Sequence, residues 1–255
     1  MSADLTIAIE TSGRAGSVAI GRDFTLLGEV FFSGYMRHSA ELFNVLDRLL
    51  DQAHSSVKSL KRCCITGGPG SFTGLRIAVT TAKMLSLSRN VQIVAADTMD
   101  VLAENAAHLE DQDTPSLDCI ATILDAKKNL FYTAVYERIE NGWNKCLPTQ
   151  TMTAEELLSW LKDNKKNHVG LLGEGLVYYA DAFRSPFTTF LDESLWSGKA
   201  SSLLSVGQRM AAAGLFATPM LFRCKIENSP PETDSVTLLE PKLRHPVFFS
   251  YFSTN

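Results

Sequence analysis

The stretch Gly68-Pro69-Gly70-Ser71-Phe72-Thr73-Gly74-Leu75-Arg76-Ile77 decides how this chain is interpreted. It joins a short apolar run, residues 63–66, to a helix-like run that extends from residue 74 to about 87. Glycine permits backbone conformations that other residues resist, and Ser71 or Thr73 can cap the helix that follows. A Gly-rich turn at a helix N-terminus also presents N–H groups to an anion. No Gly-Lys-Ser/Thr follows, so the stretch is not a Walker loop, and the simplest alternative is a tight strand-to-helix turn.

Composition limits the classes of protein that this chain can belong to. Its 255 residues suggest one large domain or two small lobes, and the net charge of −4 implies no broad basic surface. The N-terminus lacks the pattern of a signal peptide, and no apolar run reaches the length of a membrane span. We therefore expect a cytoplasmic protein without a membrane partner.

The cysteines give no sign of a disulfide framework or a zinc site. Their number is odd, and Cys-x-x-Cys spacing is absent. Buried free thiols in a reducing cytosol are the simplest explanation. The five residues are Cys63, Cys64, Cys119, Cys146 and Cys224.

The apolar pattern predicts two lobes with similar strand–helix orders. In residues 1–110 we expect strands at 5–10, 17–20, 26–32, 63–66 and 92–96, with helices at 39–53, 74–87 and 98–108. A polar linker is expected at 109–116. In residues 117–255 we expect strands at 119–124, 130–136 and 169–172. Helices are expected from Thr153, whose capping box includes Glu156, and at 176–183 and 201–216. The segment after Lys225 is Pro-rich and stays unassigned.

These motifs resemble those of the TsaB (YeaZ) family. The string at residues 68–77 resembles the family signature, and residues 9–13, Ile-Glu-Thr-Ser-Gly, resemble the family's opening Ile-Asp-Thr-(Ala/Ser). Asp125-Ala126-Lys127 and the segment 240–244 resemble further family motifs. The resemblance implies an α/β, two-lobed actin-like ATPase fold (sugar-kinase and Hsp70-like, or ASKHA). It also implies a duplicated mixed-sheet core, with partner-binding helices in the first lobe and a reduced, divergent second lobe.

The first hairpin is the candidate nucleotide or phosphate loop, formed by Glu10, Thr11, Ser12 and Gly13. In the actin-like superfamily this hairpin carries an acidic residue that approaches a phosphate. Glu10 replaces the usual Asp and is one methylene longer, so it would displace a metal or water that an Asp holds. A plain polar hairpin turn is the alternative. For Asp125 we favour a turn residue, and Gly173-Glu174-Gly175 resembles an adenosine-side loop.

No metal ligands or catalytic residues are predicted in this chain. The catalytic relatives of the TsaD family carry His-x-x-x-His, in which two histidines one turn apart share a helix face. Here the fourth residue after His38 is Leu42, which cannot bind a metal. The missing pair argues against a peptidase of the M22 type and against the catalytic paralogue.

The first two helices are the predicted interface with a partner. Small residues recur along the second helix and would allow another helix to approach closely; packing within the lobe is the alternative. In the family, these helices build a bundle with a partner subunit or a second copy. The candidate interface residues are Leu42, Val45, Leu46, Leu49, Gly74, Ala78, Thr81, Ala82 and Leu85.

The resemblance implies a non-catalytic subunit for the modification of tRNA. It would pair with a TsaD-like enzyme to form N6-threonylcarbamoyladenosine at position 37, using an adenylate made from threonine, bicarbonate and ATP. A TsaE-like small ATPase would join, tRNA would be contacted only through the complex, and the free chain would form a homodimer or none. We expect no cofactor in the chain alone, with ATP or ADP conceivable at the partner interface. The alternatives are a stand-alone ASKHA-type ATPase or kinase, which needs a catalytic Asp, and an M22-type metallopeptidase.

Overall fold

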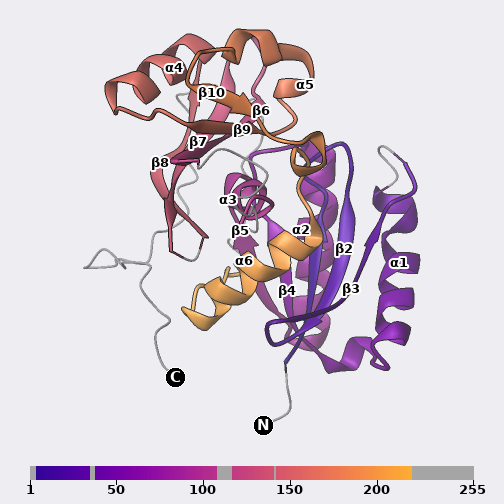
Figure 1. The fold of residues 1–255 in the computed structure, drawn as a ribbon. Helices are drawn as coiled ribbons and strands as arrows, with labels where there is room; N and C mark the ends of the chain where they lie inside the picture. Colours follow the sequence, from indigo (N-terminus) through magenta and orange to yellow (C-terminus); the bar gives the residue numbers. More distant parts are fainter. Residues whose placement is uncertain (1–3, 35–37, 108–116, 141, 220–255) are drawn as a thin grey trace.

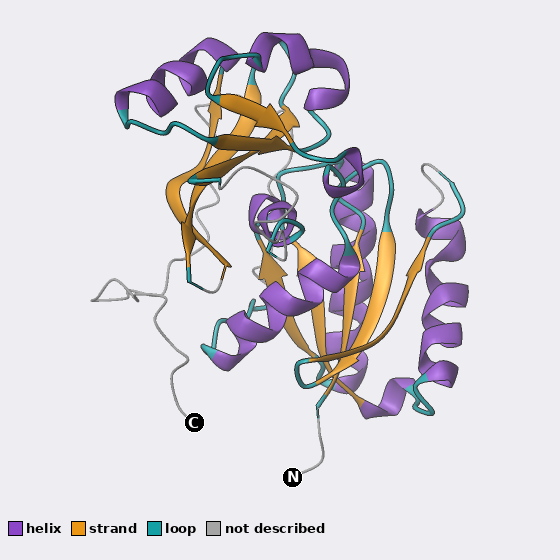
Figure 2. Ribbon diagram, in the orientation of Figure 1, coloured by secondary structure: helices purple, strands orange, loops and turns teal. Residues whose placement is uncertain are grey.

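Two five-stranded mixed sheets make up the framework of the protein (Figure 1). The structure is a computed structural model that describes residues 4–34, 38–107, 117–140 and 142–219. Figure 2 shows that helices accompany each sheet. We call each sheet, together with the helices that connect its strands, a lobe.

In the first lobe the strand order is β3-β2-β1-β4-β5. The pairs β1–β2 and β2–β3 are antiparallel, whereas β1–β4 and β4–β5 are parallel. Helix α1 and the short helix η1 precede β4, α2 precedes β5, and α3 follows β5. The bounds are β1 Leu5–Glu10, β2 Ser17–Arg22, β3 Thr25–Phe31, α1 His38–Gln52, η1 Val57–Ser59, β4 Leu60–Thr66, α2 Phe72–Arg89, β5 Gln92–Ala96 and α3 Thr98–Glu104.

The second lobe repeats this arrangement with the order β8-β7-β6-β9-β10. Its outer pairs on the β8 side are antiparallel and those on the β10 side are parallel, as in the first lobe. The bounds are β6 Cys119–Asp125, β7 Phe131–Ile139, β8 Gly142–Met152, α4 Ala154–Asp163, β9 Val169–Leu172, α5 Leu176–Tyr179, η2 Ala180–Phe183, β10 Thr188–Phe190, η3 Glu193–Leu195 and α6 Ala200–Ala212. The repeat, with an α5 of 4 residues and a β10 of 3, confirms the duplicated fold and its reduced second lobe.

Helices cover both faces of the first sheet, so every residue of β1 is buried. Large side chains such as Ile7 and Ile9 lie in the core that α1 and α2 complete. On the opposite face the residues are small, Ala8 and Cys64 among them, and α6 packs there. A Cβ added to Gly207 of α6 would lie 2.4 Å from the Cys64 sulfur. The small residues therefore bring α6 very close to the sheet.

The last helix of each lobe lies on the other lobe. Helix α3 follows β5 but contacts β6, β7 and β8, whereas α6 contacts β1, β2, β4 and β5. Figure 1 shows both helices between the sheets, where they also contact each other. The division of the chain into 1–110 and 117–255 stays a prediction. The final helix of each range, α3 or α6, packs on the sheet of the other range.

Most of the expected elements are present, but two strands were missed. Strand β8 lies at the sheet edge and pairs only with β7. It contains Pro148 and shows no regular alternation of burial, so its sequence lacks a strand signal. Strand β10 has only 3 residues. The helices expected at 98–108 and 201–216 end earlier, at Glu104 and Ala212. The expected linker at 109–116 and the segment after Lys225 lie outside the described residues.

The described cysteines are thiols in apolar surroundings. Cys63, Cys64 and Cys119 are buried, and Cys146 is partly buried. Burial raises the pKa of the Cys64 and Cys119 thiols to about 12, so neither is a nucleophile at neutral pH. Cys224 lies outside the described residues. Within residues 4–219, apart from the gaps given above, no helix is long and apolar enough to cross a membrane.

Candidate functional site

The signature turn fixes the first hairpin loop against helix α2. Gly68 has a φ of +106°, a value that favours glycine, and the Gly68–Pro69 peptide bond is cis. Ser71 donates its N–H to the carbonyl of Ser12 at 2.7 Å. The Ser71 hydroxyl accepts from the N–H of Gly74 at 3.4 Å, so Ser71, rather than Thr73, caps α2. Thr11 in turn donates its hydroxyl to the carbonyl of Gly74 at 2.7 Å.

The outer residues of the signature lie at the surface. Phe72 is 44% exposed, and the Arg76 guanidinium lies 5.0 Å from the centre of its ring. Arg76 and Thr73 line a groove between α1 and α2. The turn therefore has two roles, one in the core at Gly74 and one at the surface of α2.

Glu10 ends β1 in a fully buried position. Its Oε1 accepts the N–H of Ser12 at 2.7 Å and the Ser12 hydroxyl at 2.5 Å. Among the described residues, Oε2 of Glu10 and the hydroxyl of Thr66 make no hydrogen bond of standard geometry, although the nearby Thr66 hydroxyl acts to lower the pKa of Glu10. Burial outweighs these contacts and raises the pKa of Glu10 from 4.5 to about 7. Glu10 thus binds a proton more readily than an ordinary glutamate.

The candidate loop at Thr11–Gly13 meets a carboxylate from the second lobe. Both oxygens of Glu174 accept the backbone N–H of Arg14, at 3.1 and 3.2 Å, and Oε1 also accepts the Ser197 hydroxyl at 2.9 Å. The Arg14 side chain donates to the Tyr178 hydroxyl at 2.6 Å and lies over its ring. Sequence analysis singled out Gly173-Glu174-Gly175 but not this contact, which joins residues 160 positions apart.

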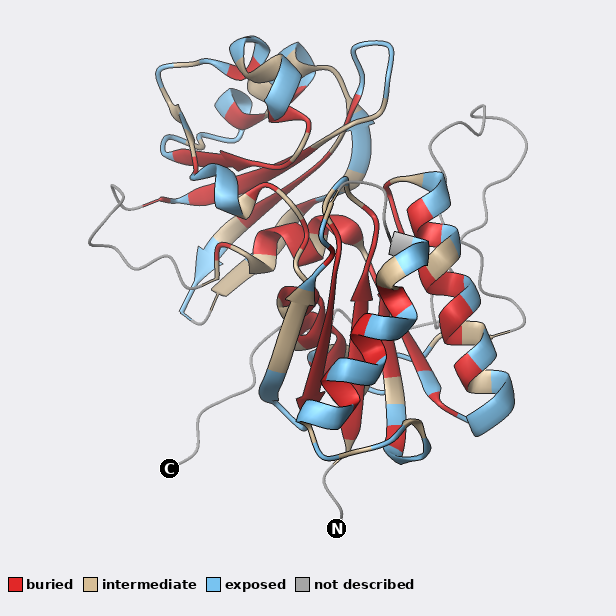
Figure 3. Ribbon diagram, turned by 90° about the vertical axis from the view of Figure 1, so that its right-hand side faces the viewer, coloured by how far each residue is buried: buried red, intermediate tan, exposed pale blue. Residues whose placement is uncertain are grey.

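The predicted interface side chains belong to the chain's own core. All nine are buried, and none of the eight that have a side chain is more than 4% exposed. Only Leu42 and Thr81 reach the groove between α1 and α2. The packing alternative therefore holds for these residues, because they close the first sheet. Figure 3 shows the two helices with buried inner faces and exposed outer faces.

The outer faces of α1 and α2 carry a different set of apolar side chains. We call these four residues the α1/α2 patch: Phe43, Phe72, Met84 and Leu87, which are 51%, 44%, 47% and 71% exposed. Two of them, Phe43 and Met84, line the groove between the helices, which has a volume of about 360 Å³. Exposed apolar patches of this kind mark surfaces that bind other molecules. That α1 and α2 bind a partner stays a prediction, now placed on the outer face.

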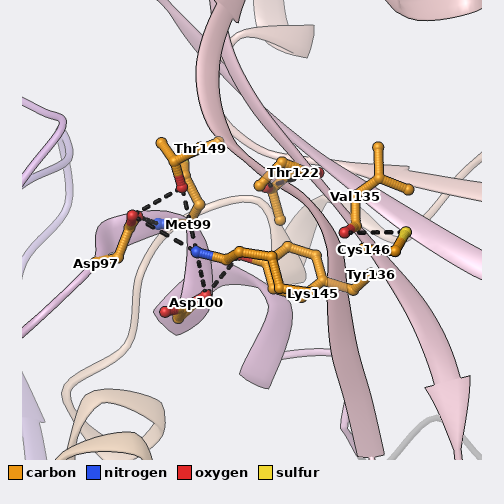
Figure 4. A network of polar contacts seen from close by, with 10 residues as sticks. Asp97, Met99, Asp100, Thr122, Val135, Tyr136, Lys145, Cys146 and Thr149 are labelled. Carbon is orange, nitrogen blue, oxygen red and sulfur yellow. Dashed lines mark hydrogen bonds and ion pairs between the residues drawn. The ribbon is translucent and has the colours of Figure 1, made fainter. Parts of the chain in front are cut away.

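A polar cluster fastens α3 to the second sheet (Figure 4). Lys145 of β8 lies 2.7 Å from Asp100 and 3.6 Å from Asp97. Tyr136 donates to Asp100 at 2.8 Å, and Thr149 donates to Asp97 at 2.7 Å. Burial raises the pKa of Asp100, while the Lys145 ammonium opposes the shift. Each carboxylate has a donor, so we interpret the cluster as a junction between the lobes. No sequence motif predicted it.

Asn105 connects the ends of both interlobe helices. Its amide nitrogen donates to the carbonyls of Leu195 and Ser197, at 2.9 and 2.8 Å. Its amide oxygen accepts the Ser202 hydroxyl at 2.7 Å. Asn105 follows α3 and Ser202 lies in α6, so one side chain ties together the two points where the chain passes between lobes.

The remaining candidates have simple roles. Asp125 accepts the backbone N–H of Lys127 at 2.7 Å and pairs with its ammonium at 3.0 Å, which confirms a turn residue. The side chain of His38 and the segment 240–244 lie outside the described residues. Among the described residues, no three His, Cys, Asp or Glu side chains gather in a metal-binding cluster.

Comparison with known proteins gives a consistent set of relatives. The model of the family described as "TsaD: tRNA N6-adenosine threonylcarbamoyltransferase" matches residues 33–218. The tRNA threonylcarbamoyladenosine biosynthesis protein TsaB of Bacillus subtilis is 28% identical over 63% of this chain and 67% of its own length. The protein of the same name from Escherichia coli is 23% identical over 82% of this chain and 87% of its own length.

A solved structure supports the fold independently. YeaZ from Pseudomonas aeruginosa superposes on this chain with a TM-score of 0.71 at 21% identity. The superposition covers 85% of this chain and 96% of the other. At this identity, the likeness shows a common fold.

Proposed function

Because this chain belongs to the tRNA N6-adenosine threonylcarbamoyltransferase (TsaD) family, and within it to the TsaB (YeaZ) group, we propose that it is an accessory subunit of the enzyme that forms N6-threonylcarbamoyladenosine on tRNA. It pairs with a TsaD-like subunit, which carries out the chemistry. The family match over residues 33–218 is the observation that carries this proposal.

The α1/α2 patch supports pairing through the first lobe. Its four apolar side chains lie on neighbouring helices, and two of them, Phe43 and Met84, line a groove together with Ser39, Thr73, Ile77 and Thr80 among others. Aromatic residues and methionine are enriched at the centres of protein interfaces, and this composition suits a helical partner. The partner's helices lie along the groove and cover Phe43 and Met84.

The geometry at Glu10 supports a non-catalytic role. A group that holds a metal or a phosphate-bound cation needs an ionised carboxylate with free oxygens. Burial instead raises the pKa of the Glu10 carboxyl to about 7, and Ser12 engages one of its two oxygens, Oε1, so that only Oε2 has no partner among the described residues. The N–H group of Arg14, in the same loop, is engaged by Glu174. These contacts favour the accessory role over a stand-alone ATPase or kinase.

The remaining parts of the proposal follow from the family. A TsaE-like ATPase joins the pair, tRNA binds through the assembled complex in the cytoplasm, and a nucleotide site, where present, lies at the subunit interface. A net charge of −4 agrees with a chain that leaves most phosphate contacts to its partners. The free chain forms a homodimer through the same α1/α2 patch.

Sedimentation of the purified chain with and without a TsaD-like subunit tests the pairing. We expect a 1:1 complex whose formation depends on the α1/α2 patch. Separate boundaries at micromolar concentrations would contradict the proposed pairing.

A further inference from the structure

The loop between β1 and β2 already holds an anion, and the anion is part of the chain. Both oxygens of Glu174 lie within hydrogen-bond distance of the Arg14 N–H, at 3.1 and 3.2 Å. Ser197 adds its hydroxyl at 2.9 Å. Two donors from separate segments thus converge on one carboxylate, an arrangement that suits any small oxyanion.

Glycine lies on both sides of this contact. A Cβ on Gly13 would lie 2.6 Å from Oε1 of Glu174, at the end of a flexible side chain, so the loop backbone lies close to the carboxylate. Gly173 has a φ of +124°, and a Cβ there would lie 2.2 Å from the carbonyl of Ile123. The turn that carries Glu174 is therefore pressed against β6, and the position of the carboxylate is set by the backbone.

A second carboxyl group, that of Glu10, lies near the carboxylate of Glu174. Glu10 is fully buried, its Oε2 has no hydrogen-bond partner among the described residues, and a Cβ added to Gly198 would lie 3.0 Å from its carboxyl carbon. Burial is the main cause of the raised pKa of Glu10, and the charge of Glu174 adds to it. A phosphate placed on the Arg14 N–H would compete with Glu174 for its donors and would face both carboxyl groups.

We propose that Glu174 is a built-in occupant of the β1–β2 loop that excludes phosphate and phosphate-bearing ligands from it. The carboxylate stands in for the ligand and joins the lobes in one closed arrangement. Removing the Glu174 side chain frees the Arg14 N–H and the Ser197 hydroxyl, and removing its charge alone weakens the hydrogen bonds that hold them, so the loop then binds phosphate. This inference concerns the chain alone and is independent of the proposed role in tRNA modification.

The test is phosphate binding by the full chain and three variants. Glu174→Ala removes the occupant, Glu174→Gln keeps its size but removes its charge, and Glu193→Ala is a matched control at an exposed glutamate outside the loop. Inorganic phosphate is titrated calorimetrically at constant ionic strength, and circular dichroism checks the fold of each variant. Because Glu174→Gln retains a side chain on the loop, it keeps the test informative if Glu174→Ala unfolds.

We expect each folded Glu174 variant to bind phosphate at least about tenfold more tightly than the wild type and Glu193→Ala, since a like charge has been removed. Competition by ADP in the variants would show that the freed loop takes the phosphate of a nucleotide, and its absence would show a site for free phosphate; both agree with the proposal. Wild-type binding as tight as that of the variants, or no gain in either folded variant, would overturn it. The readout is ligand binding, so failure here leaves the pairing and modification assays unaffected.

Discussion

The hydroxyl of Thr11 donates a hydrogen bond to the carbonyl of Gly74 at 2.7 Å, across 63 residues of sequence. It joins the loop after β1 to the first turn of α2. Both residues are buried. The bond connects the two motifs by which the family is recognised, residues 9–13 and the signature turn at residues 68–77. The signature turn thus explains the shape of the first hairpin.

Replacing Gly74 with Ala should destabilise the protein severely. In an ordinary helix interior this change is favourable by roughly 0.5–1 kcal/mol. Here the new Cβ would lie 1.8 Å from the carbonyl oxygen of Thr11, so the loop or the helix must move. We expect a loss of at least about 3 kcal/mol in chemical denaturation. Thr73→Ala, at an exposed position of the same turn, is the control and should cost less than about 0.5 kcal/mol.

Replacing Glu10 with Gln should change how stability depends on pH. The pKa of Glu10 is raised from 4.5 to about 7 in the folded state, so the folded protein binds this proton more tightly than the unfolded chain. Between these two values stability falls as the pH rises, by up to about 3 kcal/mol in total. Gln keeps the shape without ionising, so the variant should lose this fall and be more stable than the wild type at about pH 8.

Urea denaturation at a series of pH values measures this difference. Parallel profiles for the wild type and Glu10→Gln would show that Glu10 does not carry the pH dependence. Glu193→Gln, the same change at an exposed glutamate, serves as the control and should keep the pH profile of the wild type.

The fold was predictable from the sequence wherever apolar spacing or a glycine-rich turn is clear. Ile7 and Ile9 marked β1, and the signature glycines marked the turn before α2. Strand β8 escaped prediction because it lies at an edge and needs few apolar residues. The nine side chains named for the interface pack in the core, as the packing alternative had it, and a partner surface on α1 and α2 stays a prediction. Helical spacing identifies an apolar stripe, but it does not tell whether a sheet or a partner covers that stripe.

The contacts between the lobes could not have been predicted. Glu174 meets Arg14 over a separation of 160 residues, and Asn105 meets Ser197 over 92. Such contacts depend on the placement of whole sheets, which no local pattern encodes. The Gly173-Glu174-Gly175 string was the one local hint, because glycine on both sides indicates close backbone approach.

Replacing Asn105 with Ala should loosen the junction of the lobes. The side chain makes three hydrogen bonds, to Leu195, Ser197 and Ser202, in a partly buried position. Losing it leaves those partners without their donor or acceptor, and we expect a cost of about 2–3 kcal/mol. Asn164→Ala, which removes one exposed bond to Trp160, should cost less than about 1 kcal/mol. Equal costs in thermal denaturation would show that Asn105 has no special role.

Replacing Phe43 with Glu should abolish pairing with a TsaD-like subunit. Phe43 is 51% exposed in the α1/α2 patch, and a carboxylate there would be buried without a partner in the complex. Phe24→Glu, the same change at a residue 65% exposed in the turn before β3, should leave pairing intact. Sedimentation velocity distinguishes the two. If both variants pair normally while retaining the wild-type circular dichroism spectrum, the partner surface is elsewhere.

The most direct test of the central claim is an omission assay. The assay combines tRNA, ATP, threonine and bicarbonate with the adenylate-forming enzyme, the TsaD-like subunit and the TsaE-like ATPase, with and without this chain. Mass spectrometry of the digested tRNA then measures N6-threonylcarbamoyladenosine. The account predicts that the product disappears when this chain is omitted, and that the chain alone modifies no tRNA. Equal product without the chain would contradict it.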